Sequence, residues 1–250
     1  MLNMLRADSY RMIHGKSYRV CLFLTMLWVI LNSYAQTATI EIREIITGSQ
    51  VAVKYWDTFF NYYPVIIPLV IFCSYYISND FKQGTIKNYI ARGISRWNYY
   101  LSKLLVGWFA SSSFLLVAFI TGTLSSKILL GNVTYDVSIW NVSAYLLCQL
   151  LFHCAASSMG ITIAFLARNS TISTIINLLW VMFGYLCIHS IENILGLGYQ
   201  FSIFWVASNI NKTRIEQAPQ WLFIAVLLFV SYAIIGSFIS MLSLHKKDIA

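Results

Sequence analysis

Long apolar runs dominate the chain, and short polar stretches separate them. Each run is about 20 residues long, which is enough for a helix to cross a hydrocarbon core of about 30 Å. Unbroken runs such as LLVAFITGTL lack the short alternation of a membrane β-barrel. We therefore predict an all-α membrane protein with one transmembrane domain over residues 1–250. Its six spans are predicted at roughly 18–36, 59–78, 102–125, 142–166, 172–190 and 220–243.

The first 17 residues have a different pattern from the spans. Leu5, Met12 and Ile13 fall near one helical face, whereas Arg6 and Arg11 lie elsewhere. This pattern is typical of an amphipathic helix that lies at the membrane surface before the chain turns into the first span. The alternative is a frayed N-terminal tail.

Residues 191–219 are predicted to be the longest exterior segment, yet they are unusually apolar. The stretch ENILGLGYQFSIFWVASN is interrupted by Gly196 and Gly198, and its apolar part is too short to cross a membrane. We predict a re-entrant or interfacial segment before span six, with Phe204 and Trp205 as aromatic anchors. The alternative is a surface loop that packs on the spans.

In span two, Pro64 and Pro68 indicate a kink or a hinge.

Composition supports the membrane class and orients the chain. Hydrophobic residues make up 58% and charged residues 10% of the sequence, and the mean hydropathy is +0.68. The formal charge is +8, and most of the 17 basic residues fall on one predicted side. The positive-inside rule then explains the basic charge without nucleic acid and places both termini in the cytoplasm of a multi-pass cell-membrane protein. None of the five cysteines lies in a predicted exterior loop, so no disulfide framework is expected.

Catalytic and metal-binding motifs are not evident. The nine acidic residues fall in predicted loops or at span ends, and no paired carboxylates or HExxH motif occurs. His153 is the ionisable residue predicted to lie deep within a span. It belongs to a polar-to-small face, which we interpret as intramolecular packing or, alternatively, as a pathway-lining or subunit-contact surface. That face comprises Gln149, His153, Ser157 and Gly160.

The segment 77–103, between spans two and three, is the long polar interruption that has the pattern of a regular element. Asn79 or Asp80, with Gln83, resembles a helix-capping box. An apolar stripe that includes Ile86 and Tyr89 follows. Gly93 is predicted to end the helix, and Ser95 to cap the helix that enters span three. The alternative is an ordinary basic inner loop.

These residues carry a resemblance to a known family. The string Asp80…Gly84-Thr85-Ile86-Lys87-Asn88…Arg92-Gly93…Ser95-Arg96…Tyr100…Lys103 resembles the segment between spans two and three of type-2 ATP-binding-cassette (ABC) permeases. The leader Leu5–Arg11 is similar to the amphipathic elbow of that family. Asn79-Asp80 stands where the family often has glutamate.

The resemblance implies a half-transporter whose chain binds no cofactor or metal and is not itself an enzyme. A cytosolic ABC ATPase would carry ATP and Mg, and a second permease subunit, identical or related, would complete the path. The helix at 81–92 would be the coupling helix, with Phe81, Thr85, Ile86, Tyr89 and Ile90 docking on the ATPase. The residues assigned to this helix and its ends are Asp80, Phe81, Lys82, Gln83, Gly84, Thr85, Ile86, Lys87, Tyr89, Ile90, Arg92 and Gly93.

The Gly-Thr-Ile-Lys-Asn segment is similar to that of small permeases from Gram-positive bacteria that export antimicrobial or self-toxic peptides and give immunity to them. An aromatic-rich chain, with 16 Phe, 16 Tyr and 8 Trp, suits an amphipathic peptide as cargo. Export of drugs, lipids or ions is the alternative within the family. A non-transporting sensor or anchor and an intramembrane peptidase are the alternatives outside it.

Overall fold

The computed structural model describes residues 2–47, 65–130, 138–196 and 202–246. Within these ranges the regular structure is helical, as the apolar runs predict. The elements are α1 (Leu2–His14), α2 (Lys16–Thr47), α4 (Ile66–Lys82), α5 (Thr85–Ala91), α6 (Arg96–Leu130), α7 (Ile139–Ala167), α8 (Ser170–Leu195), the 3₁₀ turn η2 (Ser202–Phe204), α9 (Val206–Lys212), the 3₁₀ turn η3 (Ile215–Gln217) and α10 (Ala218–Lys246).

Five helices in the described ranges are long and apolar enough to cross a membrane. They correspond to the first, third, fourth, fifth and sixth predicted spans, and they cover Lys16–Ile40, Arg96–Leu129, Ile139–Ala167, Ser170–Leu195 and Ile215–Leu244. The second predicted span is represented by α4, and its beginning at 59–64 lies outside the described residues. The prediction of an all-α membrane protein is confirmed. α2 continues to Thr47, beyond the predicted end of span one at residue 36.

Pro68 lies in the first turn of α4. An amide at this position has no partner within the helix, so proline can occupy it without removing a hydrogen bond. Pro68 is therefore accommodated in the first turn of α4, and the kink or hinge stays a prediction. Pro64, the other proline of the predicted hinge, lies outside the described residues.

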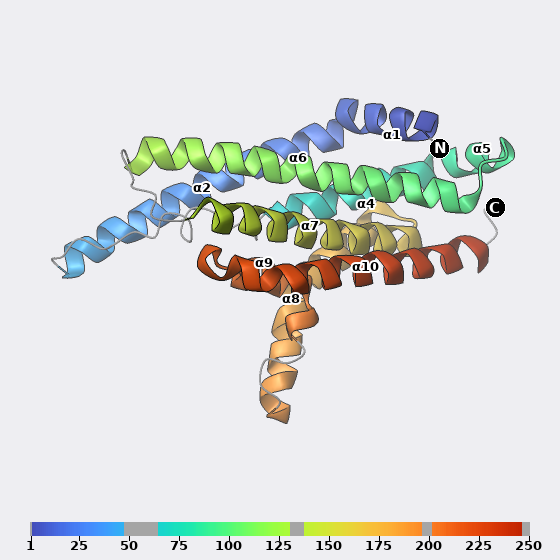
Figure 1. The fold of residues 1–250 in the computed structure, drawn as a ribbon. Helices are drawn as coiled ribbons and strands as arrows, with labels where there is room; N and C mark the ends of the chain where they lie inside the picture. Colours follow the sequence, from blue (N-terminus) through green and yellow to red (C-terminus); the bar gives the residue numbers. More distant parts are fainter. Residues whose placement is uncertain (1, 48–64, 131–137, 197–201, 247–250) are drawn as a thin grey trace.

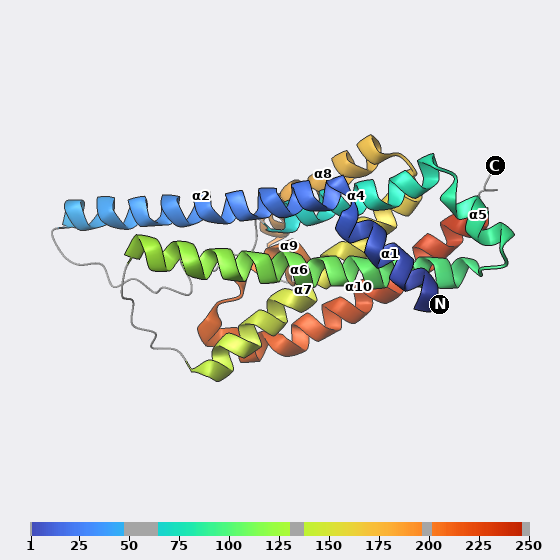
Figure 2. The ribbon, with the colours of Figure 1, turned by 90° about the horizontal axis from the view of Figure 1, so that it is seen from above.

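α7 is the centre of the bundle. In its most apolar stretch 72% of the residues are buried, and α4, α6, α8, α9 and α10 pack around it (Figures 1 and 2). Two glycines permit this close approach. A Cβ atom on Gly107 would lie 2.5 Å from Ile161 Cδ1, and one on Gly236 would lie 2.6 Å from Thr162 Oγ1. Small residues let membrane helices pack tightly where the hydrophobic effect does not drive association.

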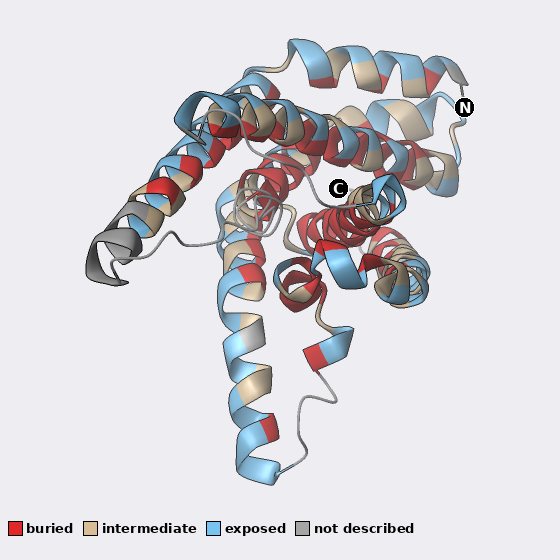
Figure 3. Ribbon diagram, turned by 60° about the vertical axis from the view of Figure 1, so that its left-hand side comes forward, coloured by how far each residue is buried: buried red, intermediate tan, exposed pale blue. Residues whose placement is uncertain are grey.

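α8 and α10 present most of their surface to the outside. Only 18% and 17% of their most apolar stretches are buried, and these exposed faces are rich in Ile, Leu, Phe and Val. The first part of α8 packs on α4 and α7, whereas its C-terminal part projects away from the other helices and is largely exposed (Figures 1 and 3). In a chain of this hydropathy, such faces are suited to contact with lipid or with another membrane-embedded subunit.

The start of α1, the end of α10 and the short helix α5 lie at one end of the bundle (Figures 1 and 2). This α5 end is also reached by the start of α6 and the end of α4. Because α1 turns onto α2 at Gly15, the amphipathic leader is a separate helix, as predicted. The two ends of the described chain therefore share one side with the predicted coupling helix.

The described part of the predicted re-entrant or interfacial segment packs into the bundle at the opposite end. Val206, Ala207 and Ile210 of α9 are buried in one cluster with Phe152 of α7. Trp205 packs against Trp180 of α8 with ring centroids 5.3 Å apart and the rings tilted by 42°. The segment is thus a short helix that contacts the spans and not an irregular loop. The glycine at 198 lies outside the described residues.

Candidate coupling site

α5 is a single short helix between two glycines with left-handed backbone. Gly84 has φ of 64° and Gly93 has φ of 79°, a region that side chains with a Cβ rarely adopt. At the C-terminal end, Ile94 N donates to Tyr89 O at 3.1 Å and Gly93 N donates to Ile90 O at 2.9 Å. This pair of bonds is a Schellman motif, which confirms the prediction that Gly93 ends the helix. The orientation of α5 is therefore set at both of its ends.

The predicted capping box is wrong. α4 continues through Asp80 to Lys82, and the residue before α5 is Gly84, which supplies no side-chain cap. Asp80 is fully buried, whereas Gln83 is exposed. The cap predicted for the next helix is confirmed, because Ser95 Oγ accepts a hydrogen bond from Asn98 N at 3.2 Å.

The apolar stripe of α5 faces the bundle. Ile86 is 1% exposed and lies within the core of this chain. The ring of Tyr89 packs on Tyr99 at 5.7 Å, and Phe81 packs edge-on to Phe165 at 5.8 Å. Ile86 is therefore not part of a docking surface, contrary to the interpretation from the resemblance. Phe81, Thr85, Tyr89 and Ile90 are half-buried.

The exposed face of this segment is polar and basic. Lys82, Lys87, Asn88 and Arg92 are exposed, and no carboxylate occurs among the exposed residues between Lys82 and Trp97. A partner that meets α5 from outside therefore encounters cations and amides before it encounters the apolar stripe. Complementary charge on the partner would be acidic.

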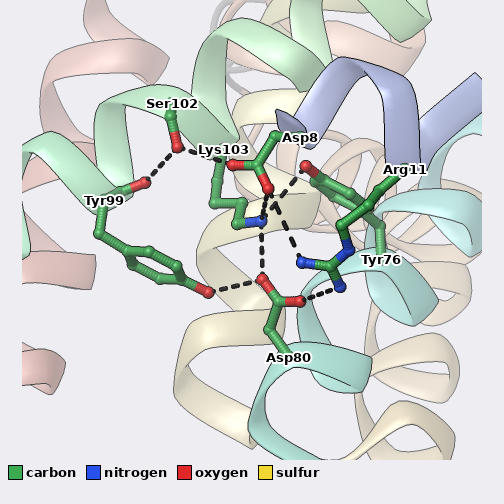
Figure 4. Close-up of polar contacts among 7 residues, drawn as sticks. All are labelled: Asp8, Arg11, Tyr76, Asp80, Tyr99, Ser102 and Lys103. Carbon is green, nitrogen blue, oxygen red and sulfur yellow. Dashed lines mark hydrogen bonds and ion pairs between the residues drawn. The ribbon is translucent and has the colours of Figure 1, made fainter. Parts of the chain in front are cut away.

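Behind α5 lies a cluster of four charged side chains, three of them fully buried and the fourth, Arg11, partly exposed (Figure 4). Asp8 and Arg11 come from α1, Asp80 from α4 and Lys103 from α6. Lys103 Nζ lies 2.7 Å from Asp8 Oδ1 and 2.7 Å from Asp80 Oδ2. The Arg11 guanidinium donates to Asp80 Oδ1 at 2.7 Å and lies 3.8 Å from Asp8. We call these four residues the charge cluster.

Neutral groups complete the hydrogen bonding of the charge cluster. Tyr99 Oη donates to Asp80 Oδ2 at 2.8 Å, and Ser102 Oγ donates to Asp8 Oδ2 at 2.9 Å. Lys103 Nζ donates to Tyr76 Oη at 3.3 Å and lies 4.7 Å from the centre of that ring. Burial of single charges costs several kcal/mol per ion unless partners compensate. In the charge cluster the formal charges of the two cations and the two carboxylates sum to zero, and each carboxylate accepts hydrogen bonds from more than one donor.

The cluster also affects Arg11, which lies outside the spans. Burial alone would lower the pKa of the Arg11 guanidinium, but the Asp80 carboxylate, the hydrogen bond to it and the Asp8 charge together hold that pKa above its ordinary value. Arg11 is therefore a permanent cation.

Sequence reasoning placed the acidic residues in loops or at span ends and treated His153 as the ionisable group at depth. Lys103 is as deeply buried as His153, with 0% of its side chain exposed. The sequence gives a partial signal, because a lysine at the start of an apolar span either extends to the membrane surface or, if it is held inside the bundle, needs a counter-charge. What the sequence did not show is which carboxylates, distant along the chain, supply it.

Two arginines attach the end of α10 to the same end of the molecule. Arg96 Nη1 donates to Leu244 O at 2.6 Å, and Arg168 Nη2 donates to Ser243 O at 2.9 Å. Carbonyls in the last turn of a helix lack intrahelical donors and attract cations. Arg168 also lies over the ring of Phe81 at 5.2 Å. The last turn of α10 is thereby connected to the segment that leads into α5.

The polar-to-small face of α7 lies inside the bundle. Gln149, His153 and Ser157 are fully buried, and Gln149 Nε2 donates to Ile210 O of α9 at 3.1 Å. His153 Nδ1 lies 2.8 Å from Gln149 O, and Ser111 Oγ of α6 donates to His153 O at 3.3 Å. A Cβ on Gly160 would lie 3.4 Å from Cys73 Cβ. These positions match the packing interpretation, and a pathway-lining role stays a prediction.

Metal-binding geometry is not found among the described residues, where no three His, Cys, Asp or Glu side chains converge. Their cysteines are all free thiols. In the part of the chain that the structure describes, polar contacts join α1, α4, α6 and α10 behind a short, exposed basic helix.

This architecture defines a polytopic helical membrane protein with a short helix at one end of its bundle whose outer face is basic and exposed. The chain matches the family model described as ABC-2 family transporter protein over residues 13–184, which is more than half of its length. It therefore belongs to the ABC-2 family and is the membrane permease component of an ABC exporter. A comparison with curated proteins found no match. The family supplies the transport component and not the catalyst, and membership implies an ABC ATPase as partner.

Proposed function

We propose that this permease subunit exports an amphipathic substrate, namely an antimicrobial or self-toxic peptide, and that a separate ATPase drives it through α5. The observation that carries this proposal is the construction of α5. The helix has a defined orientation between Gly84 and Gly93, and its apolar face packs on the bundle. Displacement of α5 by a bound ATPase would therefore move α4 and α6 with it.

In this proposal the ATPase binds ATP and Mg and meets the exposed cations Lys82, Lys87 and Arg92 with acidic side chains. The α5 end then lies in the cytoplasm of the cell, together with both termini. The concentration of basic residues at that end supports this orientation. A second permease subunit, identical or related, completes the pathway, and the exposed apolar faces of α8 and α10 offer it surface in the membrane.

An apolar cavity supports an amphipathic cargo. It has a volume of about 450 Å³ and lies between α8, α10 and the turn η2. Its wall is aromatic and aliphatic, with residues such as Trp180, Trp205, Tyr232 and Ile235. This volume fits a few apolar side chains or a small amphiphile, because drug-sized ligands occupy about 300–1,000 Å³. A drug or lipid is the alternative cargo that the same cavity favours over an ion.

The test begins with the affinity-purified complex of this chain and its ATPase in lipid nanodiscs. We expect ATP hydrolysis that an amphipathic cationic peptide stimulates. The double variant Lys87→Glu/Arg92→Glu should lose most of the stimulation while the chain still reaches the membrane. Lys127→Glu is the matched control, since Lys127 is exposed near the other end of α6.

Purification without an ATP-hydrolysing partner would refute the transporter function, and full stimulation in the α5 double variant would refute the docking assignment. Transport itself is measured with a fluorescent peptide in inside-out vesicles supplied with ATP. Uptake of drugs or lipids but not of the peptide would assign the alternative cargo.

A further inference from the structure

A cleft of about 530 Å³ lies beside the charge cluster, between the α1–α2 elbow and the last turns of α4. It is separate from the exposed face of α5 and from the apolar cavity at α8. Nothing in the proposed transport function uses it. Its lining includes Arg11, Gly15, Lys16, Tyr75, Asn79 and Gln83.

The elbow that forms one wall depends on Gly15. Gly15 N donates to Met12 O at 3.0 Å, and a Cβ at this position would lie 3.0 Å from Arg11 O and 3.1 Å from Met12 O. The absence of a side chain lets α1 turn directly onto α2. As a result Arg11, near the end of α1, and Lys16, at the start of α2, both line the same cleft.

The charge of the cleft is positive. Arg11 and Lys16 line it, and no carboxylate is among its lining residues, because Asp8 and Asp80 are wholly buried behind it. The Arg11 side chain is 35% exposed, and its guanidinium carries more donors than Asp80 and Asp8 occupy. Asn79 and Gln83 add exposed amide groups on the α4 side. Such a donor set matches an anionic phosphate ester.

Both walls change from polar to apolar in the same direction. Along α2, Lys16 is followed at helical spacing by the exposed residues Val20, Leu24 and Leu27. Along α4, read from its C-terminal end, the exposed Gln83 and Asn79 are followed by Tyr75 and Ile71. α2 enters the membrane at this end and α4 leaves it here. A ligand that fits both walls is therefore polar and anionic near α5 and apolar deeper in the membrane.

We propose that this cleft binds the headgroup of an anionic phospholipid from the leaflet on the α5 side. The phosphate contacts Arg11 and Lys16, the amides of Asn79 and Gln83 contact the rest of the headgroup, and an acyl chain lies along the exposed apolar residues of α2. A free phosphate would use the same cations but would gain nothing from these apolar residues.

The site is linked to the charge cluster through one residue. Arg11 lines the cleft and also donates to Asp80, two residues before the end of α4. A bound phosphate shares the Arg11 guanidinium with Asp80. A phosphate bound in the cleft therefore adds negative charge beside the charge cluster and weakens the interaction of Arg11 with Asp80 that holds α1 against α4.

The experiment uses the full-length chain in detergent, with bound lipid counted by native mass spectrometry during titration with phosphatidylglycerol or phosphatidylcholine. We expect phosphatidylglycerol to bind at least ten-fold more tightly. Lys16→Glu and Gln83→Glu place a negative charge on opposite walls, and each should weaken phosphatidylglycerol binding about five-fold or more. Lys87→Glu on α5 makes the same charge change as Lys16→Glu but outside the cleft, and it should have little effect.

Gel filtration confirms that each variant remains folded. Equal affinity for the two lipids would overturn the proposal. Equal losses of phosphatidylglycerol affinity in Lys16→Glu and Lys87→Glu would also overturn it, because they would show attraction of the lipid to basic surface in general. Inorganic phosphate is the further arm: if millimolar phosphate displaces phosphatidylglycerol, the cleft is a site for a free anion and not for a lipid.

Discussion

The Arg11 guanidinium on α1 lies 2.7 Å from the Asp80 carboxylate on α4, across 69 positions of sequence. This bond joins the amphipathic leader to the last turn of α4, just before the turn that leads into α5. Asp80 is also bonded to Lys103 of α6, so a displacement of α5 acts on three helices through one carboxylate. If the ATPase acts through α5 as proposed, force from α5 would enter the bundle at this carboxylate.

Replacing Lys103 with Met should destabilise the protein strongly. The change leaves Asp8 and Asp80 close together with only Arg11 as a cation, and loss of one partner from a buried pair costs about 3–5 kcal/mol. Thermal unfolding of the detergent-purified chain measures the effect. Lys103→Met/Asp8→Asn removes one charge of each sign and should recover part of the loss. Equal stability of the two variants would show that charge balance is not what the cluster requires.

Gly93→Ala should weaken coupling more than stability. A residue with a Cβ at φ of 79° costs about 1–2 kcal/mol, so the Schellman motif opens and the exit angle of α5 changes. We expect normal membrane insertion and reduced peptide-stimulated ATP hydrolysis in the complex. Asn88→Ala, at an exposed position of the same helix, should leave hydrolysis unchanged. A fully stimulated Gly93→Ala complex would contradict this view of α5.

Arg96→Ala should lower stability by about 1–2 kcal/mol, because Leu244 O then loses a charged donor in the last turn of α10. The matched control is Arg19→Ala. Arg19 also donates to a backbone carbonyl, that of His14 at 3.0 Å, but in an exposed position where water can replace it. Denaturant unfolding measures the free energy of unfolding of the two variants. Equal losses in both would show that the bond from Arg96 to Leu244 O adds no more stability than an exposed one.

Gly184→Ala should destabilise the packing of α9, because a Cβ there would overlap the indole ring of Trp205. Tryptophan fluorescence and thermal unfolding should both change. Gly160→Ala is the matched control: its Cβ would meet Cys73 Cβ at 3.4 Å, an ordinary contact distance. We expect that variant to be neutral, since alanine is the better helix former. A tolerated Gly184→Ala would mean that Trp205 can move without loss.

The helix end at Gly93 and the cap at Ser95 were predictable from the local sequence, whereas the role of Asp80 was not. Gly93 and Ser95 act through backbone atoms within a few residues, so their roles follow from the local sequence. The Asp80–Gln83 pair has the same local appearance as a capping box, yet α4 continues past Asp80. Partners on α1 and α6 hold that carboxylate inside the bundle, and no local pattern names them.

Hydropathy and charge, read along the sequence alone, determined the membrane class, the positions of the spans, the interfacial leader and the short helix between spans two and three. These properties depend on neighbours in the chain and on the thickness of a bilayer. Tertiary structure alone decided that the apolar stripe of α5 faces inward, that the α7 face is packed within the bundle, and that Asp8, Arg11, Asp80 and Lys103 meet. Contacts between helices distant in sequence decide these features, because a buried charge is stable only where the fold brings its counter-charge to it.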